Sequence, residues 1–252
     1  MNRVDKMRPN EIVGFCLMAV FAGLMIGISG MASLLSATRI EGGLGKFIGS
    51  FMFSLGLYTI LTFEMKLFTG LIPSIPTMGA RNWWKLPVCF LCNSVGVIIS
   101  GWMSTFMPVF GEISSAGSSL IAVKLNMDSW GMNALCSGFL CGVLITIAVW
   151  ALHHTLYKGL STSMGVILPI IVFVFCGFDH SVANVLYFYF LGEFSWRVIG
   201  YVLLSIVGNV IGGLSLPIVM MIRDMHKGKE TVEAELEEEF GQQSEKMEAD
   251  EK

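Results

Sequence analysis

Apolar residues dominate six long stretches of the chain, and each stretch is long enough to cross a lipid bilayer, which takes about 20 residues. The six stretches are residues 11–37, 47–77, 86–107, 130–156, 164–192 and 196–222. The pattern predicts an all-α membrane protein with six transmembrane helices. We expect the first stretch to remain in place, because it is longer than the apolar core of a cleavable signal peptide.

Polar or helix-breaking residues interrupt two of the six stretches. In the second, Glu64 and Lys66 precede a Leu-Phe-Thr-Gly sequence, and Pro73 and Pro76 follow it. In the fifth, residues 177–184 read Gly-Phe-Asp-His-Ser-Val-Ala-Asn. A broken helix is tolerated in a bilayer only where its free backbone groups line a cavity or are buried in protein. We therefore predict that the second and fifth helices are broken in mid-membrane.

The two halves of the chain resemble each other weakly. The third and sixth stretches both carry an asparagine followed by small residues, at 93–96 and 209–213. Together with the two breaks at equivalent places, this predicts an inverted repeat of three plus three helices, with the working site at the repeat interface. The alternative is that the glycines only allow helices to pack closely.

The placement of lysine and arginine predicts the orientation in the membrane. With the N-terminus inside, the cytoplasmic side holds Arg3, Lys6, Arg8, Arg81, Lys85, Lys158, Arg223, Lys227 and Lys229, and the outer side holds Arg39, Lys46, Lys124 and Arg197. This excess favours two cytoplasmic termini in an inner (plasma) membrane. We expect a cytoplasmic N-terminus over residues 1–10, a transmembrane channel domain over 11–223 and an acidic cytoplasmic tail over 224–252.

Composition supports the membrane class and narrows the chemistry. The chain is 54% hydrophobic and 14% charged, against about 25% charged in soluble domains. No basic stripe suggests nucleic acid as a partner. Cys89 and Cys92 form a C-x-x-C, but no further ligands lie nearby, so we interpret them as small buried residues and expect neither a metal nor a cofactor.

His180 is the leading candidate for function, because ionisable residues at membrane depth usually face a cavity and histidine changes charge near neutral pH. Its alternative is a structural role bonded to backbone. Thr69 lies in the other break and could hold the imidazole or donate to an anion; its alternative is a bond back to its own helix. Asp179, Ser181 and Asn184 could cap the following half-helix.

Other charged residues have less certain roles. Lys124 precedes the fourth stretch and could draw anions into a vestibule, or be an ordinary solvated lysine. Glu64 and Lys66 could pair with each other or reach the membrane surface. We expect His153 and His154 to be interfacial.

Taken together, these motifs resemble the formate/nitrite transporter family. The matching segments are residues 53–57, 67–70, 148–150, 177–184 and 208–213, and the resemblance covers about residues 11–223. It implies an aquaporin-like fold with helices two and five broken, a homopentamer with one pore per protomer, and passage of small monovalent anions. Formate, nitrite and hydrosulfide are such anions, with acetate or lactate in some members.

The resemblance also implies roles for particular residues. His180 matches the central pore histidine, Thr69 its neighbour, and Asn184 and Lys124 belong to the substrate pathway. The two constrictions would be lined by Phe53, Leu57, Leu67, Phe68 and Phe173. Two positions depart from the family pattern: Lys66 stands where an acidic or small residue is usual, and Gly142 where asparagine is frequent.

Three functions remain in competition. The first is a channel or proton-linked transporter for a weak-acid anion, which crosses as the anion or as the neutral acid. The second is an aquaporin-type channel for neutral solutes, although paired Asn-Pro-Ala sequences are absent. The third is a membrane enzyme subunit that holds a haem or metal. We favour transport and expect no enzymatic activity.

Overall fold

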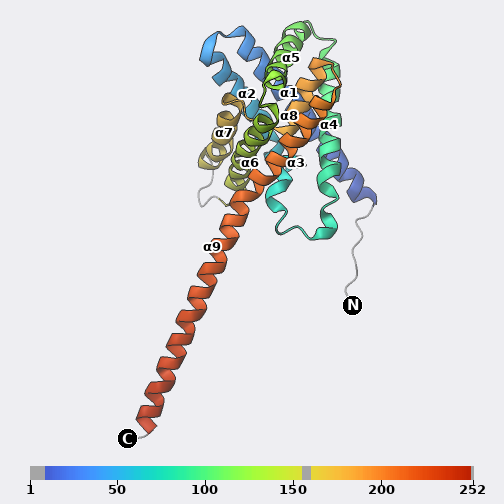
Figure 1. Ribbon diagram of the computed structural model, residues 1–252. Coiled ribbons are helices and arrows are strands. Elements are labelled where there is room, and N and C mark those ends of the chain that lie inside the picture. Colours follow the sequence, from blue (N-terminus) through green and yellow to red (C-terminus); the bar gives the residue numbers. More distant parts are fainter. Residues whose placement is uncertain (1–8, 155–159, 251–252) are drawn as a thin grey trace. The chain divides into compact units, whose positions relative to one another are not determined.

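All secondary structure in the described part of the chain is helical. The computed structural model describes residues 9–154 and 160–250, and side chains for residues 10–152 and 160–225. The helices are α1 (Pro9–Arg39), α2 (Gly42–Thr62), α3 (Phe68–Leu71), α4 (Lys85–Ser104), α5 (Phe110–Asn126), α6 (Trp130–His154), α7 (Leu160–Phe175), α8 (Ser181–Leu191) and α9 (Trp196–Asp250), with 3₁₀ turns η1 (Ile72–Ser74) and η2 (Ala80–Asn82) (Figure 1).

Five described helices are long and apolar enough to cross a membrane. They fall at Asn10–Arg39, Gly42–Thr62, Ala80–Ser104, Trp130–Leu152 and Trp196–Met225. Two shorter apolar helices, α7 and α8, occupy the region of the predicted fifth stretch. Because a full span needs about 20 residues, neither short helix is long enough to cross alone. The chain is thus a multi-pass membrane protein.

The helices end where the sequence predicts interruptions. After α2, Glu64 adopts a left-handed conformation with φ of 52°, and helical structure resumes only at Phe68. After α7, Gly177 has φ of 73°, and α8 begins at Ser181. A positive φ cannot continue a right-handed helix and is easy for glycine but unusual for other residues. The chain therefore leaves helical geometry at both places.

A helix that sequence patterning did not predict follows α4. The connection that carries Lys124 forms α5 rather than a loop, and α5 packs against α8 and α1. It is shorter than the five long apolar helices. Its last turn contains Lys124, which fixes that side chain relative to the segment before α8.

Glycines bring two pairs of helices into close contact. A Cβ atom added to Gly96 of α4 would overlap the backbone of Val20 and Gly23 in α1, and one added to Gly212 of α9 would overlap Phe139 of α6. Such contacts allow helix backbones to approach closely. The two pairs place the asparagines of α4 and α9 against neighbouring backbone.

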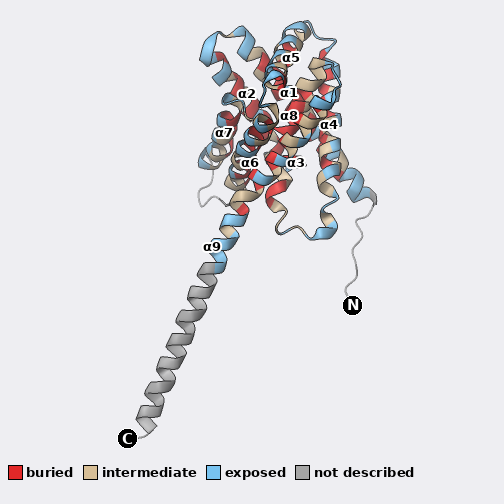
Figure 2. Cartoon of the chain, in the orientation of Figure 1, coloured by how far each residue is buried: buried red, intermediate tan, exposed pale blue. Residues whose placement is uncertain are grey.

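Most of the buried hydrophobic residues form one cluster that draws on α1 to α8, as the red segments within the helical region of Figure 2 indicate. A smaller cluster surrounds Tyr201. The described residues up to Leu214 form one compact unit, and those from Ser215 form a second. The second unit is the remainder of α9, which stays helical through Asp250. The predicted site residues all belong to the first unit.

Candidate functional site

Asn93 of α4 fixes the segment between α2 and α3. Its Nδ2 donates to the carbonyl oxygens of Ala19, at 2.7 Å, and Lys66, at 2.8 Å, and its Oδ1 accepts from the backbone N–H of Phe68, at 2.8 Å. The side chain is fully buried. Non-helical backbone thereby has its polar groups satisfied without water, as membrane depth requires.

Asn209 of α9 fixes the segment between α7 and α8 in the same way. Its Nδ2 donates to the carbonyl oxygens of Gly138 and Asp179, each at 2.8 Å, and its Oδ1 accepts from the N–H of Ser181 at 2.9 Å. In both segments the asparagine bonds the carbonyl of one residue and the N–H of the residue two positions later. Leu67 and His180 are the residues between, so they occupy equivalent places.

His180 begins α8 as its N-cap. Its Nδ1 accepts a hydrogen bond from the backbone N–H of Ala183 at 3.1 Å. An accepting Nδ1 carries no hydrogen, so the neutral ring carries its hydrogen on Nε2. The expectation that Asp179 caps this helix is wrong, because the cap is the histidine itself.

Thr69 meets the free nitrogen of His180. The distance between Thr69 Oγ1 and His180 Nε2 is 2.9 Å, and each residue is only 2% exposed. With Nε2 protonated, the ring donates to the hydroxyl oxygen, and the hydroxyl hydrogen can serve another acceptor. Two residues that lie 111 positions apart therefore form one polar spot in apolar surroundings.

Two phenylalanines enclose the imidazole ring of His180. The ring of Phe173 stacks on it with centroids 6.0 Å apart and an interplanar angle of 17°, and Phe53 meets it edge-on at 6.4 Å. Phe53 and Phe173 contact each other at 5.8 Å. All three residues are at most 2% exposed. The nitrogen-bearing edge of the imidazole is therefore the main polar group among these aromatic rings.

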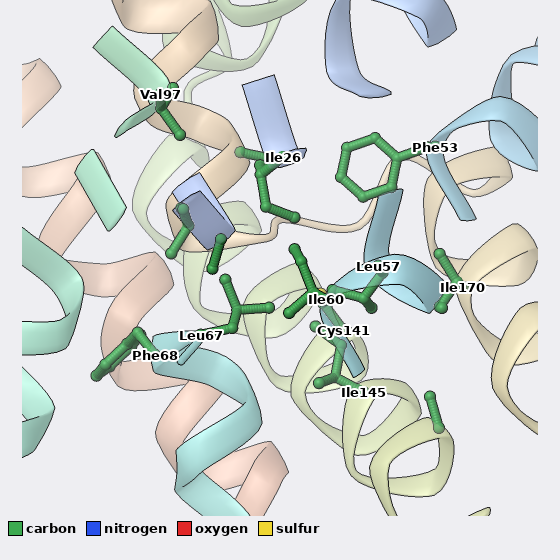
Figure 3. Packing of buried hydrophobic residues seen from close by; sticks show 14 of the residues in the cluster. Ile26, Phe53, Leu57, Ile60, Leu67, Phe68, Val97, Cys141, Ile145 and Ile170 are labelled. Atoms are coloured by element: carbon green, nitrogen blue, oxygen red, sulfur yellow. The ribbon is translucent and has the colours of Figure 1, made fainter. Parts of the chain in front are cut away.

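Leucines continue this apolar region, whereas Phe68 turns away from it. Figure 3 shows Leu57 and Leu67 directed toward the same space, with Phe68 pointing to the opposite side. The Phe68 ring packs on Phe90 of α4, with centroids 5.4 Å apart. Of the five residues predicted to line constrictions, Phe53 and Phe173 contact His180. Leu57 and Leu67 are directed toward one space, and Phe68 points away from it.

Two cavities border parts of this apolar region. The first, of about 280 Å³, is bordered by Phe53, Phe173 and His180. It also reaches Asn184, Tyr187, Lys46 and Lys124. The second, of about 430 Å³, is bordered by Leu67 and Gly70 and reaches Glu64, Lys66 and Trp150. We call them the first and second vestibules. They share no lining residue, and Leu57 and Thr69 border neither.

Asp179 is a buried carboxylate held by side chains from four helices. Oδ1 accepts from Lys124 Nζ at 2.8 Å and from Asn184 Nδ2 at 3.0 Å. Oδ2 accepts from Tyr201 at 2.7 Å and from Ser137. Lys124 also donates to the carbonyl of Gly177 at 2.8 Å. A buried charge is stable only when paired and hydrogen-bonded in this manner.

This network changes the interpretation of Lys124 and Asn184. Both border the first vestibule, and their place in a substrate pathway stays a prediction. Lys124, however, is not a free cation, because its ammonium is ion-paired with a carboxylate whose side chain is fully buried. Sequence reasoning missed Ser137 and Tyr201, which carry no motif and reach Asp179 only through the packing of α6 and α9.

The remaining expectations concern metals and outlying residues. In the part of the chain that the structure describes, no group of three or more metal-ligating side chains lies together. The side chains of His153 and His154 lie outside the described residues. Ser181 Oγ is buried and has no hydrogen-bond partner among the described groups.

Comparison with known proteins decides the family. Residues 2–223 match the family model described as formate/nitrite transporter. The chain belongs to the formate/nitrite transporter family. It is 30% identical to the uncharacterized transporter YrhG of Bacillus subtilis (strain 168) over 68% of this chain and 69% of that protein. It is 26% identical to the formate channel FocA of Escherichia coli (strain K12), over 66% of this chain and 62% of that protein.

The structural comparison agrees on the fold. A solved pentameric formate channel with formate bound superposes with a TM-score of 0.72 at 22% sequence identity. The match covers 87% of this chain and 99% of that one. The matched region covers about two thirds of the length of each curated relative named above. These relatives are transporters and channels rather than enzymes.

Proposed function

We propose that the chain forms a pore for a small monovalent weak-acid anion, of the formate, nitrite or hydrosulfide class, with His180 at its centre. The family match supports this class of cargo, and the apolar barrier between two vestibules supports a narrow path. In this proposal α2 with α3 and α7 with α8 are the halves of two broken helices. The Asn93 and Asn209 contacts then mark the two halves of an inverted, aquaporin-like repeat of six helices.

The observation that carries the proposal is the contact between Thr69 Oγ1 and His180 Nε2. In the proposed pore this pair offers a hydrogen-bond donor within an apolar barrier whose other members are Phe53, Phe173, Leu57 and Leu67. An anion that leaves water for such a place loses several kcal/mol of hydration. A hydrogen bond from the Thr69 hydroxyl, whose oxygen accepts from Nε2–H, offsets part of that cost, because charge-assisted hydrogen bonds are the strong ones.

Proton exchange at His180 would require a local rearrangement. Protonating Nδ1 removes the acceptor for the N–H of Ala183, so the first turn of α8 loses its cap in that state. We propose that the neutral ring acts as donor while the anion arrives. For the anion to cross as the neutral acid, water first protonates Nδ1, and the resulting cationic ring gives its Nε2 proton to the anion and becomes neutral again; because Nδ1 must release the N–H of Ala183, this transfer is coupled to movement at this turn.

We extend the proposal to assembly and location. The pentameric state of the similar formate channel supports a homopentamer with one pore in each protomer. The lysine and arginine distribution supports an inner, plasma-membrane location with both termini cytoplasmic, so that the first vestibule faces outward. Residues 11–223 would form the channel domain, between a cytoplasmic segment at 1–10 and the acidic tail at 224–252. Acetate and lactate are the larger candidate cargoes.

The second candidate is a channel for neutral solutes, because interrupted helices that meet in mid-membrane also suit aquaporins. The presence of a lysine outside the Asp179 network at each vestibule, Lys46 at the first and Lys66 at the second, favours anions instead. The proposal assigns neither a haem nor a metal to the chain.

Flux into vesicles separates these functions. Purified full-length protein in liposomes is offered formate, nitrite and hydrosulfide, and separately glycerol and water under an osmotic gradient. Uptake of at least one anion well above protein-free vesicles, without faster swelling in glycerol, supports the anion pore. Faster glycerol or water passage without anion uptake would favour the neutral-solute channel.

A further inference from the structure

The second vestibule contains a cation that the site around His180 does not use. Lys66 borders this cavity and directly precedes Leu67 of the barrier. We propose that the Lys66 ammonium binds the permeating small anion in the second vestibule, immediately before the barrier. This binding site rests on the proposed function and adds a residue that determines how readily anions reach the barrier from that side.

The backbone of Lys66 is held firmly in place. Its carbonyl oxygen accepts from Asn93 Nδ2 at 2.8 Å and from Cys89 Sγ at 3.3 Å. Asn93 and Cys89 are fully buried. The side chain of Lys66, by contrast, is only partly buried and faces a cavity of about 430 Å³. Because the backbone is fixed and the four-carbon side chain is flexible, the ammonium group can adjust its position to bind a mobile anion.

The equivalent position in the other segment shows how unusual the charge of Lys66 is. Asp179 and Lys66 both offer their carbonyl oxygen to an asparagine, and each lies one residue before the barrier residue. The carboxylate of Asp179 is matched by Lys124. Among the side chains that the structure describes, no ion pair involves Lys66. Its charge is therefore available to a ligand.

Among the residues that the structure describes, Glu64 is the one other charged residue at the second vestibule. It is exposed and sits at the left-handed turn, two residues farther from the barrier in sequence. Water screens an exposed charge more than a partly buried one. The field beside Leu67 is consequently set mainly by Lys66. A vestibule lined by low-dielectric walls focuses such a field and raises the local concentration of counter-ions.

Currents from each side of a planar bilayer test the proposal with the full-length protein. Formate is placed on one side at a time, first at low ionic strength, for wild type, Lys66→Gln, Lys66→Arg and Glu64→Gln. The matched control is Lys85→Gln, since Lys85 lies at the start of α4 and borders neither vestibule. In parallel, an amine-reactive ester labels lysines with and without formate, and mass spectrometry follows Lys66 and Lys85.

We expect Lys66→Gln to lower formate current from the second-vestibule side about fivefold at low salt, with a smaller loss at about 0.5 M salt because of screening. Lys66→Arg should keep most of the current, and Lys85→Gln nearly all. Formate should slow labelling of Lys66 but not of Lys85. Equal currents in Lys66→Gln and Lys85→Gln, together with unprotected Lys66, would overturn the site. So would a rise in Glu64→Gln with no change in Lys66→Gln, because the carboxylate would then govern access.

The labelling arm separates failure of this inference from failure of the proposed function. If wild type carries no formate but formate still protects Lys66, the anion site stands and the pore proposal falls. If wild type carries formate and Lys66 is neither protected nor needed, the pore stands and the Lys66 site falls.

Discussion

Asn93 and Asn209 make matching sets of hydrogen bonds, each to one helix and to one interrupted segment. Asn93 joins Ala19 of α1 to the Lys66–Phe68 backbone, and Asn209 joins Gly138 of α6 to the Asp179–Ser181 backbone. The barrier residues Leu67 and His180 lie between the bonded groups. The position of the histidine is thus set by an amide on α9 rather than by the loop alone.

Replacing either asparagine by alanine should destabilise the fold strongly. Each variant leaves a buried N–H without a partner and removes one donor from each of two carbonyls, at about 1–3 kcal/mol for each group that is left unsatisfied. We expect a fall in Tm of roughly 5–15 °C for Asn209→Ala, given about 2–4 °C for each kcal/mol in a chain of this size. Scanning calorimetry in detergent measures it.

Asn126→Ala, at the exposed end of α5, is the control and should change Tm by no more than about 2 °C, as surface substitutions usually do. A similar Tm in Asn209→Ala and Asn126→Ala would mean that the interrupted segments do not depend on the asparagines.

The hydroxyl of Thr69 should matter for transport more than for folding. Thr69→Val keeps the shape and removes the group that meets His180 Nε2, whereas Thr69→Ser keeps the hydroxyl. Removing one hydrogen bond to a migrating charge costs about 1.5–3 kcal/mol, which corresponds to about 10- to 100-fold in formate flux. Initial uptake rates into vesicles give this ratio. Equal rates for the Val and Ser variants would remove Thr69 from the pathway.

Phe53 and Phe68 should behave differently although the sequence groups them together. Phe53 contacts Phe173 and His180, so Phe53→Ala should widen the barrier, raise formate current and weaken selectivity against chloride. Phe68 packs on Phe90, so Phe68→Ala should lower stability by about 3–5 kcal/mol without a comparable gain in current. Single-channel or ensemble currents and Tm, measured on both variants, check the distinction; opposite results would place Phe68 in the path.

Close helix contact at Gly212 should be sensitive to a single methyl group. Gly212→Ala directs a Cβ at the Phe139 backbone, whereas a Cβ at Gly14 of α1 meets nothing within 4 Å. We expect Gly212→Ala to cost about 1–3 kcal/mol by overpacking. Gly14→Ala should be neutral or stabilise by up to about 1 kcal/mol, as in helix interiors generally. Thermal unfolding of the two variants side by side tests the contact, and equal Tm values would argue against it.

The places where α2 and α7 end could be predicted from the sequence because they depend on local chemistry. Glycine, proline and charged residues disfavour a continuous membrane helix. Their presence near Lys66 and His180 therefore predicts that helical structure ends at these two places. The meeting of Thr69 with His180 followed from supposing that the two halves of the chain correspond. Neither inference needed knowledge of how the helices pack.

Other features could not be predicted because they arise from packing alone. Ser137 and Tyr201 reach Asp179 from separate helices, and nothing in their neighbouring sequence marks them. Phe68 and Leu67 are adjacent in sequence, yet side chains of successive residues point in different directions, and only the structure shows which one faces the barrier. The pairing of Lys124 with Asp179 likewise depends on α5, which the apolar pattern did not reveal.

The pH dependence of formate flux in His180→Asn tests the central claim most directly. Asparagine keeps a side-chain acceptor that can cap α8 but does not titrate, and an unchanged Tm would show that the fold survives. We expect wild-type flux to vary with external pH between 5 and 8 and the variant to have a nearly flat profile. The same pH dependence in both proteins would contradict a pore whose chemistry centres on His180.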